Sequence, residues 1–263
     1  ALCGKSLVGG DGLSGYDETL AASLTASDTR LIPFLPYLLQ DIFELGSDSR
    51  EIAGLLALHA CPDESSRIID LGCGKGAVSL EIASRFSCRV EGRDLMEAFI
   101  AEAKARAEAS NLSSLCNFVV EDLRRSVQTE RGYDVAIYGA VGPVFGDQRR
   151  CLSSLRPVVR SGGYLVIDDA WGPEGSGYPT LAQWRDLFGT TGYTVVAEVP
   201  VDSGWLQSEN ERNQACIEQR AQELCGAYPD LSDMFIRYVE DQRAECEELA
   251  NTIVGVTWLL QVR

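Results

Sequence analysis

Residues 70–76 carry the side chains best suited to chemistry in this chain. They read Asp-Leu-Gly-Cys-Gly-Lys-Gly and follow the apolar residues 68–69, and residues 76–86 have the apolar spacing of a helix. Glycines allow positive φ angles and let a ligand lie against bare backbone. The third glycine comes one residue too early for a dinucleotide site, and the acid would repel a pyrophosphate. The pattern favours a nucleotide-like ligand that carries an ammonium group.

This loop resembles motif I of the class I S-adenosylmethionine-dependent methyltransferases. The resemblance implies that Asp70, Gly72, Cys73 and Gly74 contact S-adenosylmethionine, and we interpret Cys73 as a small filler whose backbone meets the cofactor. An NAD-linked dehydrogenase would rest on fold analogy alone, and the glycine spacing opposes it.

Two further acids follow predicted strands. Residues 88–95 read as a strand that ends in an acid, and Asp94 follows Gly72 by 22 positions, close to the roughly 20 expected for a ribose-binding carboxylate. The resemblance implies that Asp94 holds both ribose hydroxyls and that Leu95 lies against the adenine. After the strand at residues 116–120, it implies that Asp122 receives the adenine amino group, with Leu123 in the same site.

The fourth and fifth strands of the resemblance fall at residues 132–140 and 161–168. Tyr138 and Gly139, near the end of the fourth, are predicted to contact the cofactor. Asp168 and Asp169 end the fifth and are candidates for a catalytic base or orienting group, because paired acids raise one another's pKa. The alternative is a turn with solvated acids.

No metal is expected at this site. A metal-dependent O-methyltransferase would need an acid at the end of the fourth strand, where the chain has Tyr-Gly-Ala at residues 138–140. The chain also has one histidine, His59, which we interpret as structural.

The elements that must position these residues predict an α/β fold. With the resemblance, they imply a doubly wound, mostly parallel seven-stranded sheet, whose last strand, at residues 252–262, is antiparallel as in the family. N-terminal helices at residues 16–27, 31–45 and 50–60 would cover the cofactor, with Tyr16 as a lid contact. The resemblance covers about residues 50–200.

A helical insertion is predicted before the last strand. Residues 207–225 and 231–250 have helical patterns, and the turn sequence Gly-Ala-Tyr-Pro-Asp separates them. We interpret the insertion as a cap over the substrate pocket or as a dimer contact. The predicted domains are a lid at 1–60, a cofactor domain at 61–201 plus 252–263, and a cap at 202–251.

Charge and composition disfavour nucleic acid and membranes as partners. The chain has 23 basic and 39 acidic residues, a formal net charge of −16, which disfavours nucleic acid because phosphates bind clustered Lys and Arg. No apolar run is long enough to span a membrane, and residues 1–15 lack a signal-peptide pattern. The nine cysteines are irregularly spaced, as expected for reduced thiols in the cytoplasm.

These observations predict an S-adenosylmethionine-dependent methyltransferase that acts on a small-molecule acceptor and leaves S-adenosylhomocysteine. The alternative is a catalytically inactive, cofactor-binding regulatory protein. Both need the cofactor residues, so only turnover separates them.

Overall fold

The strands that the structure describes form a single mixed sheet. A computed structural model describes residues 15–142 and 144–263, and within them the strands form one seven-stranded sheet of order β3-β2-β1-β4-β5-β7-β6. Strands β1 to β5 pair in parallel, and β7 runs antiparallel to both β5 and β6. The strands are β1 Arg67–Leu71, β2 Arg89–Asp94, β3 Cys116–Val120, β4 Tyr133–Gly139, β5 Val159–Trp171, β6 Tyr193–Pro200 and β7 Val254–Val262. The predicted fold class, including its antiparallel last strand, is confirmed.

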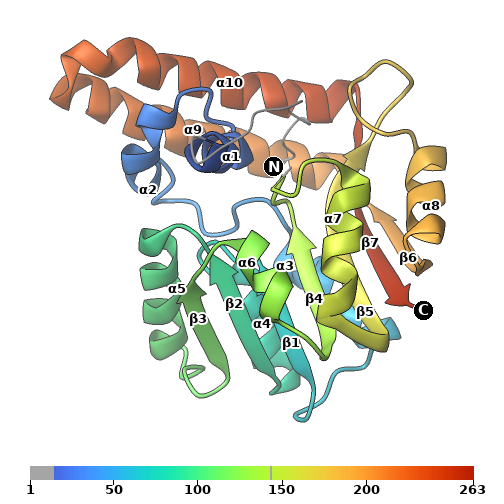
Figure 1. Ribbon diagram of the computed structural model, residues 1–263. Helices are drawn as coiled ribbons and strands as arrows, with labels where there is room; N and C mark the ends of the chain where they lie inside the picture. Colours follow the sequence, from blue (N-terminus) through green and yellow to red (C-terminus); the bar gives the residue numbers. More distant parts are fainter. Residues whose placement is uncertain (1–14, 143) are drawn as a thin grey trace.

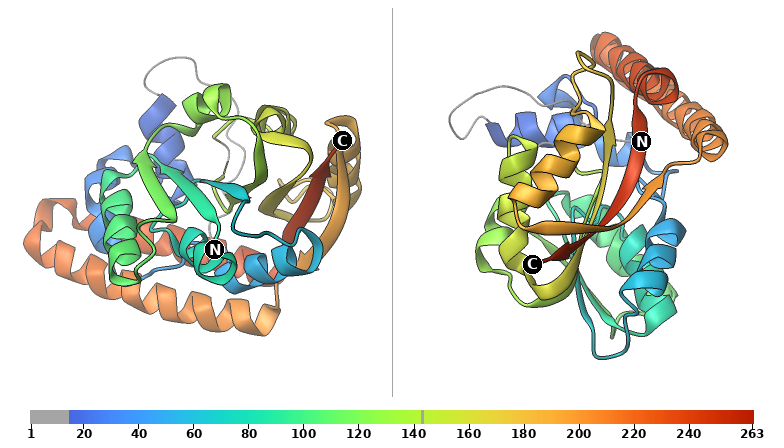
Figure 2. Two further views of the ribbon diagram at one scale, coloured as in Figure 1. Left: turned by 90° about the horizontal axis from the view of Figure 1, so that it is seen from below. Right: turned by 90° about the vertical axis from the view of Figure 1, so that its right-hand side faces the viewer.

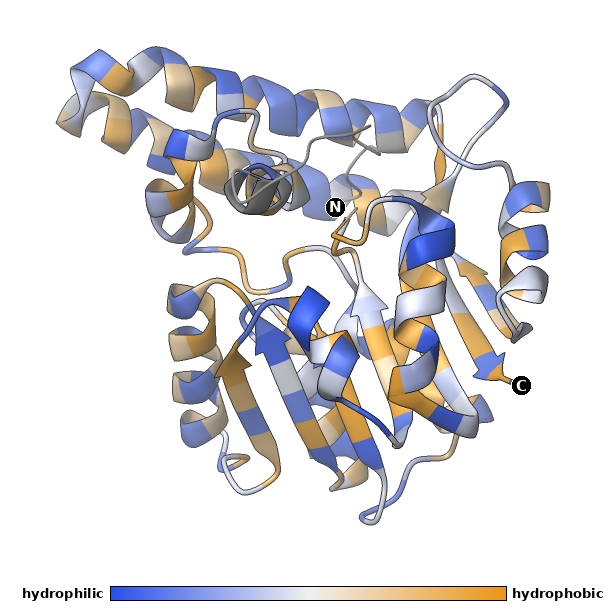
Figure 3. Ribbon diagram, in the orientation of Figure 1, coloured by the Kyte–Doolittle hydropathy of each residue, from blue (hydrophilic) through white to orange (hydrophobic). Residues whose placement is uncertain are grey.

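Helices cover both faces of the sheet, so the central strands are apolar on both sides. On one face, α3 (Ser49–His59), α4 (Ala77–Phe86) and α5 (Glu97–Ala109) pack on β1, β2 and β3. On the other face lie α6 (Leu123–Thr129), α7 (Gln148–Leu155) and α8 (Leu181–Thr190), shown in front of and beside the sheet in Figure 1. Figure 3 shows the resulting hydrophobic stretches along the strands.

A helical layer lies beyond the carboxyl ends of the parallel strands. It contains α1 (Gly15–Ser23), the 3-10 helix η1 (Thr29–Phe34), α2 (Leu35–Leu38), α9 (Ser203–Ala227) and α10 (Ser232–Asn251). Figure 1 and the right-hand view of Figure 2 show the long α9–α10 hairpin on this side of the molecule. The layer has its own apolar core, in which Leu35 and Leu38 meet Ile217, Phe235 and Tyr238. N-terminal and inserted segments are therefore packed together above the sheet edge.

The helix predicted at residues 31–45 was wrong. Pro33 and Pro36 limit this segment to η1 and the four-residue α2, because proline removes a backbone donor and restricts the preceding residue. Residues 39–48 form turns and bends. The predicted helix at 16–27 also ends early, at Ser23. The helix α9 extends beyond its predicted bounds of 207–225, whereas α10 lies within one residue of the predicted 231–250.

Candidate active site

The glycine loop between β1 and α4 is joined to the neighbouring strand through its backbone. The amides of Gly72 and Cys73 both donate to the Arg93 carbonyl, at 2.8 and 3.0 Å. Gly72 has φ +86°, and a Cβ at this position would lie 2.4 Å from Cγ2 of Val141. Only glycine satisfies both the angle and the contact, so the loop holds an open backbone against the residues that follow β4.

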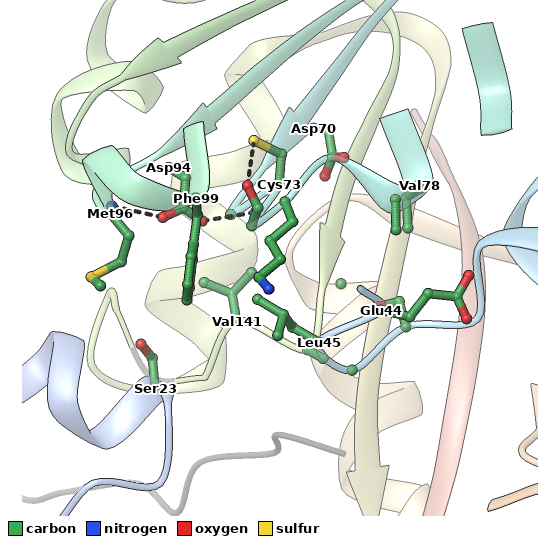
Figure 4. Close-up of a pocket in the computed structure, with 18 of the residues that line it drawn as sticks. Ser23, Glu44, Leu45, Asp70, Cys73, Val78, Asp94, Met96, Phe99 and Val141 are labelled. Atoms are coloured by element: carbon green, nitrogen blue, oxygen red, sulfur yellow. Dashed lines mark hydrogen bonds between the residues drawn. The ribbon is translucent and has the colours of Figure 1, made fainter. Parts of the chain in front are cut away.

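Asp94 is held in place by two backbone amides. Its Oδ2 accepts from the Gly74 amide at 2.9 Å and its Oδ1 from the Met96 amide at 2.8 Å, and Figure 4 shows both bonds. Burial raises the pKa of Asp94, while the two amides oppose that shift. Each carboxylate oxygen keeps a lone pair for another donor. The side chain is thus a fixed acceptor at the cavity wall.

Asp70 lies deeper in the same site. It is 3% exposed, and Ser79 Oγ donates to its Oδ2 at 2.6 Å. Burial, followed by the charges of Asp94 and Asp168, raises the pKa of Asp70 to about 7 despite that hydrogen bond. Among the described residues no Lys or Arg forms an ion pair with Asp70 or Asp94. Buried acids without a counter-ion favour a cationic ligand.

An open cavity lies beside these acids, with about 710 Å³ of space that includes its mouth to solvent. Its walls come from separate parts of the chain: Ser23 of α1, residues 43–47, the glycine loop, Met96 and Val141. Figure 4 shows Ser23, Leu45 and Val141 around this space, with Asp94 and Phe99 on its other side. Distant segments therefore form one site at the carboxyl edge of the sheet.

A neighbouring cavity continues from the first. The two share Gly72, Asp94 and Val141, and the second adds Leu95, Asp122 and Leu123. Asp122 also caps α6 by accepting from the Arg124 amide at 2.9 Å. The structure thus brings most of the predicted cofactor residues into one continuous cleft: Asp70, Gly72, Cys73, Gly74, Asp94, Leu95, Asp122, Leu123 and Gly139.

Two predicted contacts have side chains placed elsewhere. Tyr138 points to the opposite side of β4, where its hydroxyl donates to the Gly142 carbonyl at 2.7 Å. The Cys73 thiol lies against the strand below the loop, since a Cβ on Gly92 would meet its Sγ at 2.9 Å. Burial raises the pKa of Cys73 well above its usual value, as expected for a filler. Tyr16 falls in α1, but its side chain lies outside the described part of the structure.

Asp168 and Asp169 do not form the pair that their adjacency suggested. Successive strand residues point to opposite faces: Asp168 lies on the face of Ser47 and Gly139, and Asp169 lines a separate cavity with Tyr138 and Cys151. Burial, not a neighbouring Asp169 charge, raises the pKa of Asp168. Its Oδ1 and the Ser47 Oγ are buried without a hydrogen-bond partner among the described residues.

Sequence reasoning missed the part of the wall at residues 43–47 and the role of Lys75. The wall has no periodic pattern, because it is neither helix nor strand. A basic residue within a glycine loop was a visible signal, but its partners come from residues 39–40 and 102.

A family model described as a methyltransferase domain matches residues 62–243 of this chain. The chain belongs to this family. It is a class I S-adenosylmethionine-dependent methyltransferase family member, and S-adenosylmethionine is the cofactor that this family uses. The buried acids without a counter-ion, the glycine backbone and the fixed Asp94 acceptor fit such a cofactor.

Relatives of this methyltransferase family member include a malonyl-[acyl-carrier protein] O-methyltransferase of Bacillus anthracis, 33% identical over 40% of this chain and 38% of that protein. An O-methyltransferase of Pyrenophora dematioidea is 29% identical over 56% of this chain and 55% of its own. The chain thus spans about half or less of these curated relatives. The solved S-adenosylhomocysteine complex of a methyltransferase from Geobacter sulfurreducens shares the fold, with a TM-score of 0.72, 20% identity, and coverage of 88% and 98% of the two chains.

In the described part of the chain, no helix has both the length and the apolar character needed to cross a bilayer.

Proposed function

We propose that this chain transfers a methyl group from S-adenosylmethionine to a small-molecule acceptor and releases S-adenosylhomocysteine. The observation that carries the proposal is the cleft in which Asp94, held by the Gly74 and Met96 amides, lies next to the buried Asp70. The family match supports the reaction class, and it offers no support for an inactive, cofactor-binding protein.

The cleft offers a place for each part of the cofactor. Asp94 would accept from the ribose hydroxyls, while Leu95, Asp122 and Leu123 would surround the adenine. Asp70 would favour the ammonium group through its charge. When bound, the cofactor supplies a methyl group already activated on a sulfonium, so the protein's task is to align the acceptor and exclude water.

The acceptor is proposed to be small and largely apolar. A separate cavity of about 510 Å³ lies next to the cofactor cleft, with Ala140 common to both. Its walls include Tyr138, Phe145 and Trp184, and Asp169 supplies an acid. Because the chain carries excess negative charge, a neutral or cationic acceptor is favoured over nucleic acid.

Asp168 is the proposed group for holding a proton released by the acceptor. Its buried Oδ1 has no hydrogen-bond partner in the described structure, and burial raises the pKa of this carboxyl, although Ser47 and Thr257 oppose the shift. Asp169 is the alternative on the other side of β5, next to the aromatic cavity.

The helical layer is proposed to act as lid and cap, with the domain division 1–60, 61–201 plus 252–263, and 202–251. The shared apolar core of α2, α9 and α10 supports a cap over the cleft in preference to a dimer contact. Deletion of residues 207–250 tests this role: a protein that still bound cofactor and methylated normally would contradict it.

The eight described cysteines are free thiols, which supports a cytoplasmic location.

Calorimetric titration with S-adenosylmethionine, S-adenosylhomocysteine and NADH tests the cofactor. We expect the first two to bind and NADH not to bind. A labelled-methyl assay over hydroxyl, amine and carboxylate metabolites then tests transfer. Binding of NADH alone, or no binding at all, would overturn the proposed function.

A further inference from the structure

The segment at residues 39–47 forms part of the cofactor wall without belonging to any helix or strand. Residues 43–47 line the main cavity, and the backbone bonds at the segment's start are local turns such as that from the Ile42 amide to the Leu39 carbonyl. Its position against the glycine loop must therefore depend on side chains.

Lys75, within the glycine loop, provides the first of these contacts. Its side chain is 1% exposed, and its Nζ lies 2.8 Å from the Leu39 carbonyl, 3.3 Å from the Gln40 carbonyl and 3.0 Å from Glu102 Oε2. An ammonium group has three N–H donors, and these three acceptors use all of them. Lys75 thus holds the segment and has no donor left for a ligand.

A second cation holds the same segment through the same acid. Glu102 Oε1 accepts from Arg106 Nε at 2.9 Å and from Arg106 Nη2 at 2.6 Å. The Arg106 guanidinium lies 4.0 Å from the centre of the Phe43 ring, within cation–π range. Glu102 therefore connects two contacts, one at the start of the segment and one at the cavity wall.

The glycine loop allows this segment to approach closely. A Cβ on Gly74 would lie 3.0 Å from Leu45 Cδ1, and the Gly74 amide is the one that donates to Asp94. A shift of the segment would therefore change the surroundings of the residue that fixes Asp94.

We propose that Lys75, Glu102 and Arg106 are positioning residues that hold segment 39–47 as a wall of the cofactor cleft. They set how tightly the cofactor binds and how slowly it leaves, although the Lys75 ammonium group has no donor left for the cofactor. The inference rests on the proposed function only for the identity of the ligand.

The test uses the full chain and S-adenosylhomocysteine. Lys75→Met leaves two carbonyls and a carboxylate without their donor, so we expect affinity to fall about tenfold or more, mainly through faster dissociation. Arg106→Met removes the ring contact and an ion pair with Glu102 whose arginine is 40% exposed, so it should cost only about two- to threefold. Lys104→Met is the matched control, because Lys104 is exposed on α5 near Glu102. Lys75→Arg should restore part of the affinity.

Hydrogen exchange of the ligand-free protein provides a second readout. Lys75→Met should speed exchange at residues 39–47 and leave the central strands β1 and β4 unchanged, and Lys104→Met should change neither. Unchanged affinity, or faster exchange spread evenly over the sheet, would overturn the proposal. If wild-type protein bound no S-adenosylhomocysteine, the proposed function would fail, while the exchange comparison would still decide whether Lys75 positions the segment.

Discussion

Buried or partly buried carboxylates occur in two neighbouring regions of this protein, and only one region supplies a cation for them. On β2, the Arg93 side chain is 7% exposed and lies 2.6 Å from Glu91, 2.8 Å from Glu130 and 3.4 Å from Glu121. Tyr133 donates a further hydrogen bond to Glu130 at 2.7 Å. The charges of this region are compensated within the fold.

Asp70 and Asp94, beside the cofactor cleft, have no such cation among the described residues. Asp70 is buried at the end of β1 and Asp94 is partly buried at the end of β2, and their partners among the described residues are Ser79 and backbone amides. The first region lowers the pKa of Glu130 through Tyr133 and Arg93 against the effect of burial, whereas burial raises the pKa of both aspartates. Acids that a fold buries without a cation cost stability and prepare a site for a cationic ligand.

The largest effect is expected on the compensated side. Arg93→Met removes the cation shared by three acids, so the free energy of unfolding should fall by about 3–5 kcal/mol. Urea denaturation measures this change. Arg89→Met, an exposed substitution on the same strand, is the control. A loss below about 1 kcal/mol would show that solvent already compensates these acids.

Asp94→Asn should give the next largest effect, this time on binding. A neutral amide cannot accept charge-assisted hydrogen bonds from a diol, so affinity for S-adenosylhomocysteine should fall about 100-fold. Stability should change little, because the relief from burying an ionised acid is offset by the loss of one backbone hydrogen bond, which the Asn NH2 group cannot accept. Glu91→Gln is the matched control and should leave calorimetric affinity unchanged; equal losses in both variants would erase the contrast between the regions.

The effect of pH on cofactor affinity should be smaller than the effect of Asp94→Asn. Since the pKa of Asp70 is about 7, affinity for S-adenosylmethionine should rise several-fold between about pH 6 and pH 8 as the acid ionises. The native-state pKa is above the unfolded value of 3.8. Stability from this group is therefore present below about pH 4 and is lost as the pH rises through 7.

Asp70→Asn separates these two effects. The variant should flatten the pH profile of binding, and its ligand-free melting temperature should exceed that of wild type at about pH 8, where the buried charge costs most. Titrations and thermal scans across the pH range measure both. A binding profile that keeps its slope would assign the titration to another group.

The smallest effect is expected at Cys73. Its thiol lies against Gly92 and away from the ligand cleft, so Cys73→Ala should change affinity for S-adenosylhomocysteine by less than about threefold and cost on the order of 1 kcal/mol of stability. Calorimetry and denaturation measure the two. A loss comparable to that of Asp94→Asn would mean that the thiol, and not the acids and the loop backbone, binds the ligand.

Local patterns in the chain predicted much of this molecule. The apolar runs, the glycines at 72, 74 and 76, and the acids that end β1 and β2 are signals carried by adjacent residues, and they predicted the central strands and the glycine loop. Such signals depend on backbone geometry and side-chain periodicity, which act over a few residues. The antiparallel last strand and the roles of the cofactor residues were predicted from the resemblance to the methyltransferase family.

The remaining features required the tertiary structure. Pro33 and Pro36 should have ended the helix predicted at residues 31–45, but where the chain went next depended on distant partners such as Lys75. Asp168 and Asp169 point to opposite faces of β5 because side chains alternate along a strand, but which groups surround each acid depended on the packing of distant elements on those faces. By itself, the sequence determined the strands and the acids at their ends; only tertiary packing decided which acids received a cation, because ion pairing depends on distance in space and not along the chain.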